Sequence, residues 1–337
     1  MYTSALALIA AFAVAQTPGL EQAYLSGREL VHSTPITAQA EGRWTEGSFA
    51  SADGARIHYR KRAGAGPAIL LIHGWEVGPE LFDRVSATLF PGRAMVVLGR
   101  RGYSPSEAGD ADETSVGTLN AQDVARAMRV AAAAGGTPKV GVVAVSLGAL
   151  LLPPLDETHT AWLALISPGA PKLARYMSAV DRTFAEATNV TYLASRFWLP
   201  YAREAWLYSI AKTLVDDFAK QVSENADDSN RGLLEAWVKR AQSRLDEPRW
   251  RELFIQESLY AGFGDARLVV APRVPIFAAH GDKDTTVPQA AFDALCADLG
   301  GRAKVYHMPG GHMTPMLDPS QFAPALEAFE RGLSAPD

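Results

Sequence analysis

Short apolar runs alternate with segments of helical spacing over most of the chain. Between the runs, helical periodicity bounded by Gly, Pro or Asp predicts helices at 118–134, 289–299 and 321–333. The run at 56–62 alternates apolar and polar residues and is typical of an edge strand. The remaining runs are mostly continuous, as expected for strands buried on both faces of a parallel sheet; they are 68–73, 94–98, 139–145, 162–166, 274–279 and 303–307. This alternation predicts an α/β fold with a doubly wound, mostly parallel sheet.

The alternation stops between residues 171 and 264, where the sequence has helical spacing, many aromatic residues and no strand-like run. An insertion of this size predicts a helical cap, because open α/β sheets bind ligands at the carboxyl ends of their strands. We expect the cap at 169–265, between core segments at 43–168 and 266–337. The expected substrate contacts on its underside, for which packing within the cap is the alternative, are Trp198, Tyr201, Trp206 and Tyr260.

The N-terminal segment has the pattern of an export signal. Residues 1–15 contain no charged side chain, and the apolar run at 5–15 ends in a small-x-small pattern of the kind that signal peptidases cut. The run is shorter than the ~20 residues of a membrane-spanning helix, and no Lys or Arg precedes it. We expect a signal peptide at 1–15, a polar linker at 16–42, and a periplasmic or secreted protein. The alternative is a cytoplasmic or peripheral membrane protein that keeps this segment and associates weakly with a membrane through it.

The composition limits the classes of function. The chain has 337 residues, of which 48% are hydrophobic and 20% charged, enough to bury a large core. The 32 Lys and Arg residues against 37 Asp and Glu give a net charge of −5, which offers no electrostatic basis for binding nucleic acid. The single cysteine, Cys296, excludes an internal disulfide, and the histidines lack metal-ligand spacing. We expect a hydrophobic small-molecule partner, with no metal.

The most informative residue for chemistry is Ser146. The run at 139–145 leads into Ala144-Val145-Ser146-Leu147-Gly148 and then into helical sequence. Small residues two positions before and after a serine permit a sharp strand-to-helix turn that presents the hydroxyl group. Such a serine needs a histidine as its base and a carboxylate behind that histidine.

The base and the acid are expected after two later strands. Asp282 and Asp284 follow the run at 274–279, and His312 follows the run at 303–307 in a glycine-rich turn. Both loops would lie at the carboxyl edge of the sheet, where Ser146 also emerges. From these residues alone, either aspartate could orient His312.

Four separated motifs resemble those of serine hydrolases of the α/β-hydrolase fold, in the same order and over about residues 48–333. The motifs are LLIHGW at 70–75, GRRGYSPS at 99–106, AVSLG at 144–148, and GDKD at 281–284 with Gly311-His312. The sequence departs from the family pattern at Gly99 (usually Asp), at Ser104 (usually Gly), and at Ala144 and Ala149 (glycines of the serine turn). All four positions support the backbone, so the departures concern local geometry more than the catalytic groups.

The resemblance implies a role for each matching catalytic residue. Ser146 would be the nucleophile, His312 the general base, and Asp284, rather than Asp282, the residue that orients His312. The oxyanion hole would consist of the backbone N–H groups of Trp75 and Leu147.

Other residues in or next to these motifs have two possible roles each. Arg100 and Arg101 would anchor their loop, with an anionic substrate group as the alternative ligand. His73 would shape the loop before Trp75 rather than act in catalysis, and Glu76 would face either the pocket or solvent.

The implied reaction is a two-step acyl transfer that cleaves a small-to-medium hydrophobic ester without a cofactor. Carbon–carbon bond hydrolases, lactonases, thioesterases and perhydrolases use the same triad and stay as alternatives. The HGW sequence at 73–75 is also common in epoxide and haloalkane hydrolases. Those enzymes resemble a family that uses an aspartate as its nucleophile. Because this chain has Ser146 at the corresponding turn, their reaction is disfavoured here. A binding protein that keeps the fold without turnover is the alternative of another class.

Overall fold

The computed structural model describes residues 44–333 except 76–77, 113, 225–229 and 265. The expected signal peptide (1–15) and linker (16–42) lie outside the described residues. The described chain divides into two compact units, one made of 44–187 with 253–333 and a smaller one made of Thr188–Glu252. The smaller unit falls within the range expected for the cap.

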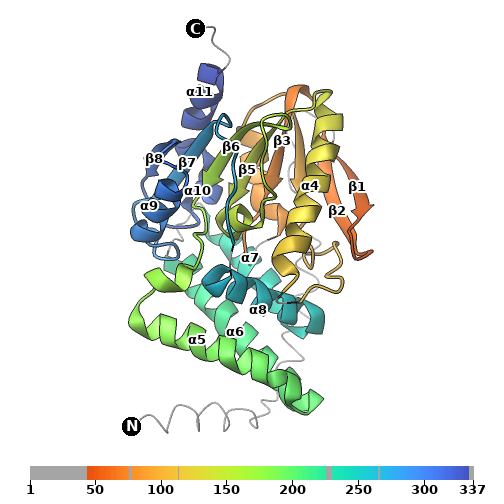
Figure 1. The fold of residues 1–337 in the computed structure, drawn as a ribbon, viewed down its shortest axis with the longest axis vertical. Helices are drawn as coiled ribbons and strands as arrows, with labels where there is room; N and C mark the ends of the chain where they lie inside the picture. The colour runs from red at the N-terminus through yellow and green to blue at the C-terminus, as the bar shows by residue number, and fades with distance from the viewer. Residues whose placement is uncertain (1–43, 76–77, 113, 225–229, 265, 334–337) are drawn as a thin grey trace. The chain divides into compact units, whose positions relative to one another are not determined.

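The larger unit is built on a mostly parallel sheet, as predicted. Within the described residues the sheet has eight strands in the order β1-β2-β4-β3-β5-β6-β7-β8 (Figure 1). The β1–β2 and β2–β4 pairs are antiparallel and the others are parallel. The strands are β1 (Trp44–Ala50), β2 (Arg56–Arg62), β3 (Ala65–Ile72), β4 (Arg93–Leu98), β5 (Val140–Val145), β6 (Thr160–Ile166), β7 (Ile276–Gly281) and β8 (Ala303–Met308).

One prediction at the antiparallel end of the sheet is wrong. The strand at Arg56–Arg62 is not an edge strand, because β1 pairs with it from Trp44↔Arg62 to Ala50↔Arg56 and forms the edge itself. Alternation of apolar and polar residues indicates that one face of a strand is exposed to water. It does not indicate whether the strand has a neighbouring strand on both sides. The short sequence of β1 has no buried position and therefore lacks the apolar run that would have predicted it.

Helices cover both faces of the sheet. On one face, α4 (Val116–Gly135) and α9 (Gln289–Asp298) contribute to a single apolar core with alternate residues of the strands, and Figure 1 shows α4 lying along this face. On the other face, α11 (Ala323–Leu333) places Phe329 against Phe277 of β7, with ring centroids 5.7 Å apart. The three predicted helices are thus confirmed to within a few residues. Shorter elements are η2 (Pro79–Phe82), α3 (Asp83–Thr88), η3 (Ser146–Leu151), η4 (Leu173–Tyr176), α10 (Thr314–Leu317) and η7 (Pro319–Gln321).

The smaller unit is helical, as the sequence predicts, and the described residues between 171 and 264 contain no strand. Trp206 is buried there against Tyr192 and Trp198. Two ion pairs, Arg203–Glu252 and Arg251–Glu204, tie its helices together. The elements are α5 (Ala179–Ala194), which enters this unit at Thr188, η5 (Ser195–Phe197), α6 (Pro200–Glu224), α7 (Arg231–Ser243), η6 (Arg244–Asp246) and the first turn of α8 (Pro248–Phe263). In the part of the chain that the structure describes, no helix has the length and apolar character to cross a membrane.

Candidate active site

Ser146 lies on the sharp turn between β5 and η3. Its φ of +49° is in the left-handed region that residues other than glycine rarely adopt. The turn packs closely on the end of β3, because a Cβ added at Gly148 would lie 2.8 Å from the carbonyl oxygens of Ile72 and His73. Glycine is therefore required at position 148. The helical sequence that follows forms a short 3₁₀-helix, η3.

The alanines at two family glycine positions fit this turn. Ala144 and Ala149 are both buried members of the main apolar core, so their methyl groups replace glycine hydrogens without exposing apolar surface. At the third departure, Gly99, a Cβ would lie 3.2 Å from His58 O and 3.3 Å from Ser106 Oγ. The usual aspartate would need this loop to shift.

Ser146, His312 and Asp284 form one chain of hydrogen bonds. Ser146 Oγ lies 2.9 Å from His312 Nε2, and His312 Nδ1 lies 2.7 Å from Asp284 Oδ2. His312 follows β8 and Asp284 follows β7, so all three side chains come from loops at the carboxyl ends of parallel strands. The second carboxylate oxygen, Asp284 Oδ1, accepts the backbone N–H groups of Thr286 and Val287 at 3.0 and 2.9 Å.

The surroundings of Asp284 favour its ionised form. Burial raises the pKa of this carboxyl, but the charge and hydrogen bond of His312, with the Val287 N–H, lower it by more, so that the pKa lies below its ordinary value. An ionised Asp284 accepts the proton of His312 Nδ1, which leaves Nε2 as the acceptor for the Ser146 hydroxyl. This is the tautomer in which His312 can take a proton from Ser146.

The loops that carry Asp284 and His312 are in direct contact. A Cβ at Gly281 would lie 2.5 Å from Gly310 O, and the Lys283 N–H donates to the same oxygen at 2.9 Å. Asp282, the alternative acid, points elsewhere: it is exposed, and its Oδ1 lies 3.8 Å from His307 Nδ1. The buried His280 supports the loop that carries Asp284 by donating its Nε2–H to Val287 O at 2.9 Å.

The segment from His73 to Trp75 passes beside Ser146. A Cβ added at Gly74 would lie 2.8 Å from Ser146 Cβ and 3.4 Å from its Oγ. The Trp75 ring stacks on Phe254 of α8, with centroids 4.3 Å apart, and its Nε1–H donates to Phe254 O. The Leu147 N–H belongs to the first turn of η3, where N–H groups have no partner within the helix. Glu76 lies outside the described residues.

An apolar cluster adjoins this segment. It consists of Leu147, Leu150, Leu151 and Ala266, with Trp75, Tyr260 and Ala261 packed against it. Of the four expected substrate contacts, Tyr260 belongs to the same compact unit as Ser146, and its ring also packs on Gly117 of α4. Trp198, Tyr201 and Trp206 belong to the Thr188–Glu252 unit, and all four roles stay predictions.

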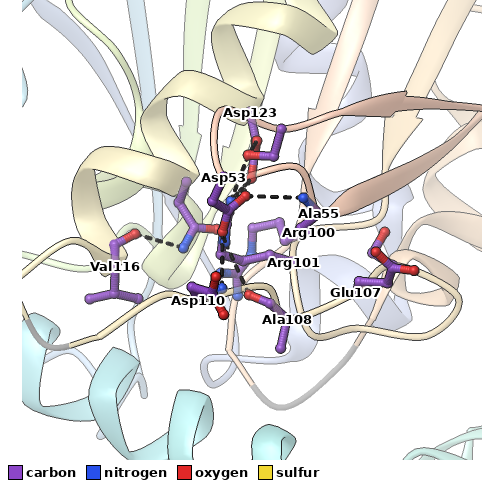
Figure 2. A network of polar contacts seen from close by, with 12 residues as sticks. Asp53, Ala55, Arg100, Arg101, Glu107, Ala108, Asp110, Val116 and Asp123 are labelled. Atoms are coloured by element: carbon purple, nitrogen blue, oxygen red, sulfur yellow. Dashed lines mark hydrogen bonds and ion pairs between the residues drawn. The ribbon is translucent and has the colours of Figure 1, made fainter.

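Arg100 and Arg101 are both buried and bind protein groups, as expected of loop anchors. Arg101 donates to Asp123 Oδ2 at 2.8 Å, to Asp53 Oδ2 at 3.0 Å and to Ser51 Oγ at 2.7 Å. Figure 2 shows this network, in which Asp53 also accepts the backbone N–H of Ala55. The sequence singled out the arginines but none of these partners.

Arg100 points to the candidate site instead. Its guanidinium donates to His73 O at 3.0 Å, to Gly74 O at 2.7 Å and to both carboxylate oxygens of Glu257 in α8. The Arg100 backbone N–H donates to His73 Nε2 at 3.1 Å, so His73 Nδ1 carries the proton that binds Gly74 O at 2.9 Å. His73 is thus neutral and shapes the loop, as expected.

Cys296 lies half-buried in α9. Burial, with a smaller contribution from Asp293, raises the pKa of its thiol to about 11. The thiol therefore stays protonated at neutral pH and is a poor nucleophile.

The sequence model of the alpha/beta hydrolase family matches residues 69–325. The chain belongs to the α/β-hydrolase family. Among curated protein sequences no significant match is found.

Solved structures of other hydrolases share this fold. An esterase from Exiguobacterium antarcticum is 16% identical with a TM-score of 0.58, over 84% of this chain and 98% of its own. A 2-hydroxy-6-oxo-6-phenylhexa-2,4-dienoate hydrolase from a Rhodococcus species is 18% identical with a TM-score of 0.60, over 86% and 99%. A haloalkane dehalogenase from Agrobacterium tumefaciens is 15% identical with a TM-score of 0.62, over 87% and 98%. At these identities the likeness shows the fold, and the reaction has to be argued from the site.

Proposed function

We propose that this protein is a serine hydrolase that cleaves an ester of a small-to-medium hydrophobic substrate through an acyl-enzyme. The observation that carries the proposal is the unbroken hydrogen-bond chain from Ser146 Oγ through His312 to Asp284. A serine on a strained turn, a base within 2.9 Å and a carboxylate behind that base are the parts that nucleophilic acyl transfer requires.

In the first half of the reaction, Ser146 Oγ attacks the ester carbonyl carbon while His312 Nε2 takes the hydroxyl proton. The carbonyl π electrons move to the oxygen, and the backbone N–H groups of Leu147 and Trp75 stabilise the resulting oxyanion. The tetrahedral intermediate collapses, the bond to the alkoxy oxygen breaks, and His312 gives its proton to the leaving alcohol.

In the second half, His312 takes a proton from water, whose oxygen attacks the acyl carbon. The bond to Ser146 Oγ then breaks and the proton returns to Ser146, which releases the carboxylic acid. Asp284 stays ionised throughout and stabilises the imidazolium form of His312. The balance is one ester and one water in, one acid and one alcohol out, with no cofactor.

Two further observations support the choice of substrate class and nucleophile. The apolar cluster of Leu147, Leu150, Leu151 and Ala266 adjoins the serine turn and suits an apolar acyl or alkyl group. The residue on the turn is a serine, so a mechanism that begins with a carboxylate nucleophile lacks its first group at this position.

A series of p-nitrophenyl esters from acetate to decanoate tests the proposal, with Ser146→Ala as the control. We expect turnover that is lost in the variant, with an optimum chain length that measures the apolar space beside Ser146. In parallel, a fluorophosphonate should add once per chain, at Ser146, by intact mass.

The two readouts separate the alternatives. Labelling of Ser146 without ester turnover would favour a carbon–carbon bond hydrolase, lactonase, thioesterase or perhydrolase. A folded protein with neither labelling nor turnover would contradict the proposal and favour the binding protein.

Export through the N-terminal segment is a separate proposal, supported by the apolar run at 5–15. We expect a mature protein that lacks about the first 15 residues, measured by the mass of protein recovered from the native host. A full-length mature chain would contradict cleavage and favour an attached apolar segment.

A further inference from the structure

A buried ion pair lies next to the segment that carries Trp75. Arg100, which follows β4, and Glu257 of α8 are 1% and 0% exposed. Arg100 Nη1 lies 2.5 Å from Glu257 Oε1, and the Tyr103 hydroxyl donates to Oε2 at 3.3 Å. Removing two charges from water costs solvation energy that their attraction often fails to return. Stabilisation of the fold alone therefore does not explain well why Arg100 and Glu257 are buried together. The other groups that Arg100 binds suggest what else the pair does.

Those groups belong to the backbone beside the nucleophile. Arg100 Nη2 and His73 Nδ1 both donate to Gly74 O, at 2.7 and 2.9 Å. A trans peptide unit is planar, with its C=O and N–H pointing in opposite directions. Because Gly74 O is held by Arg100 and His73, the Trp75 N–H of the same peptide unit points away from the guanidinium.

We propose that Arg100, held in place by Glu257, is a positioning residue that directs the Trp75 N–H toward the oxyanion. The inference rests on the proposed acyl transfer at Ser146. Arg100 acts through the peptide unit and does not touch the substrate. Its charge at Gly74 O also polarises the peptide unit, which makes the Trp75 N–H a stronger donor.

Helix α8 also contacts the segment that carries Trp75 directly, in addition to its contact through Glu257 and Arg100. Phe254, one turn before Glu257, stacks on the Trp75 ring and accepts its Nε1–H. The backbone and the side chain of Trp75 are thus both fixed from one helical face. Arg100 stands at the variable position of the D-x-R-G segment, where Arg101 matches the family arginine, so the family resemblance does not imply this role.

The test is the double variant Arg100→Met/Glu257→Met, with steady-state kinetics on the best ester of the series. Both charges leave together, and apolar residues of similar volume are a change that buried ion pairs often tolerate. We expect kcat to fall roughly 10- to 100-fold with KM within about twofold, because loss of a whole oxyanion donor costs about 10²- to 10³-fold in kcat. The rate of phosphonate labelling at Ser146 should fall in parallel.

The matched control is Arg101→Met/Asp123→Met, which removes the adjacent buried pair. Arg101 binds Asp123, Asp53, Ser51 and Ala108 and does not bind Gly74, so kcat should stay within about twofold of wild type. An equal loss of kcat in both double variants would reduce Arg100 to a structural role and overturn the proposal.

A second variant, Arg100→Lys, keeps a cationic donor for Gly74 O but cannot form the paired bonds to Glu257. Its kcat should lie between those of wild type and the double variant. Unchanged kcat in a folded Arg100→Met/Glu257→Met protein, or in Arg100→Lys if the double variant does not fold, overturns the proposal while acyl transfer stands. A wild type without turnover or Ser146 labelling overturns both.

Discussion

Two buried aspartates in the larger unit have pKa values shifted in opposite directions. Burial raises the pKa of Asp123 by more than Arg101 and Ser51 lower it. Burial also acts to raise the pKa of Asp284, but the opposing effects of His312 and the Val287 N–H are larger, and the pKa is lowered. Depth of burial therefore does not decide the state of a carboxyl group; the set of partners does.

The two networks also end differently. Arg101, the partner of Asp123, donates its other hydrogen bonds to Asp53, Ser51 and Ala108. None of these bonds leads from the network to the candidate site. His312, the partner of Asp284, has its other ring nitrogen on the half-buried Ser146. A buried carboxylate can support chemistry when its partner passes the effect on to a group that reaches substrate. The first network should therefore affect stability and the second activity.

The largest effect that separates them is expected from Asp284→Asn compared with Asp123→Asn. Asparagine at 284 cannot hold His312 in the required tautomer, so kcat should fall about 10³- to 10⁴-fold on a p-nitrophenyl ester. Asp123→Asn should keep kcat within about threefold and lower the urea midpoint. Comparable activity in the two variants would break the distinction.

Arg101→Met should give the largest loss of stability. It leaves Asp123 and Asp53 without their common cation, and breaking a buried pair typically costs about 3–5 kcal/mol. Urea unfolding at pH 7 measures the difference. The Arg101→Met/Asp123→Met protein should recover part of the loss, and a double variant less stable than the single one would show that the charges are not the cause.

One glycine packs against each of the two networks, so substituting each by alanine tests whether one network affects activity and the other stability. A methyl group at Gly74 would press on Ser146 Cβ at 2.8 Å, so Gly74→Ala should displace Ser146, the proposed nucleophile, and lower kcat about 10- to 100-fold. Gly109 has a φ of +64°, and a Cβ there would press on Asp53 Oδ2, so Gly109→Ala should lower the melting temperature and leave kcat nearly unchanged. The reverse pattern of kcat and melting temperature would contradict the assignment.

The smallest effect concerns acid stability. Burial acts to raise the pKa of Asp53, but hydrogen bonds from Arg101, Asp110 and Ala55, with the charge of Arg101, bring it to about 2, below its ordinary 3.8. A lowered pKa stabilises the folded state above pH ~4, and this contribution is lost as the pH falls through about 2. Allowing for solvent screening, it should amount to about 1–2 kcal/mol.

Urea unfolding of wild type and Asp53→Asn at pH 5 and near pH 2 checks this. The difference in unfolding free energy should be present at pH 5 and shrink toward pH 2. A difference that does not depend on pH would assign the loss to packing rather than to charge.

The sequence predicted the parallel strands well, because continuous apolar runs such as 94–98 report burial on both faces. The position of Ser146 on a sharp turn could also be predicted, because such a turn requires small residues close to it in the sequence. The edge strand β1 was missed because its side chains bury too little to form a pattern.

Partners that lie far away in the chain could not be predicted. Glu257 is 157 residues from Arg100, and nothing in the helical sequence around it marks it as the partner of a buried arginine. Asp53 and Asp123 likewise look like turn and helix-surface residues until the fold brings them to Arg101. Charge pairing within a core depends on topology, which short-range patterns do not encode.

The distance along the chain between Ser146 and His312 also sets an order of events during protein synthesis. The two residues are 166 positions apart, and at about 5–20 residues per second the ribosome takes roughly 10–30 s to travel between them. When Ser146 is made, strands β3 and β5 are complete, while Asp284, β8 and His312 have not yet been synthesised. A nascent chain thus carries its proposed nucleophile for about half of translation, 166 of 337 residues, before it acquires the group proposed to activate it, because His312 follows the last strand.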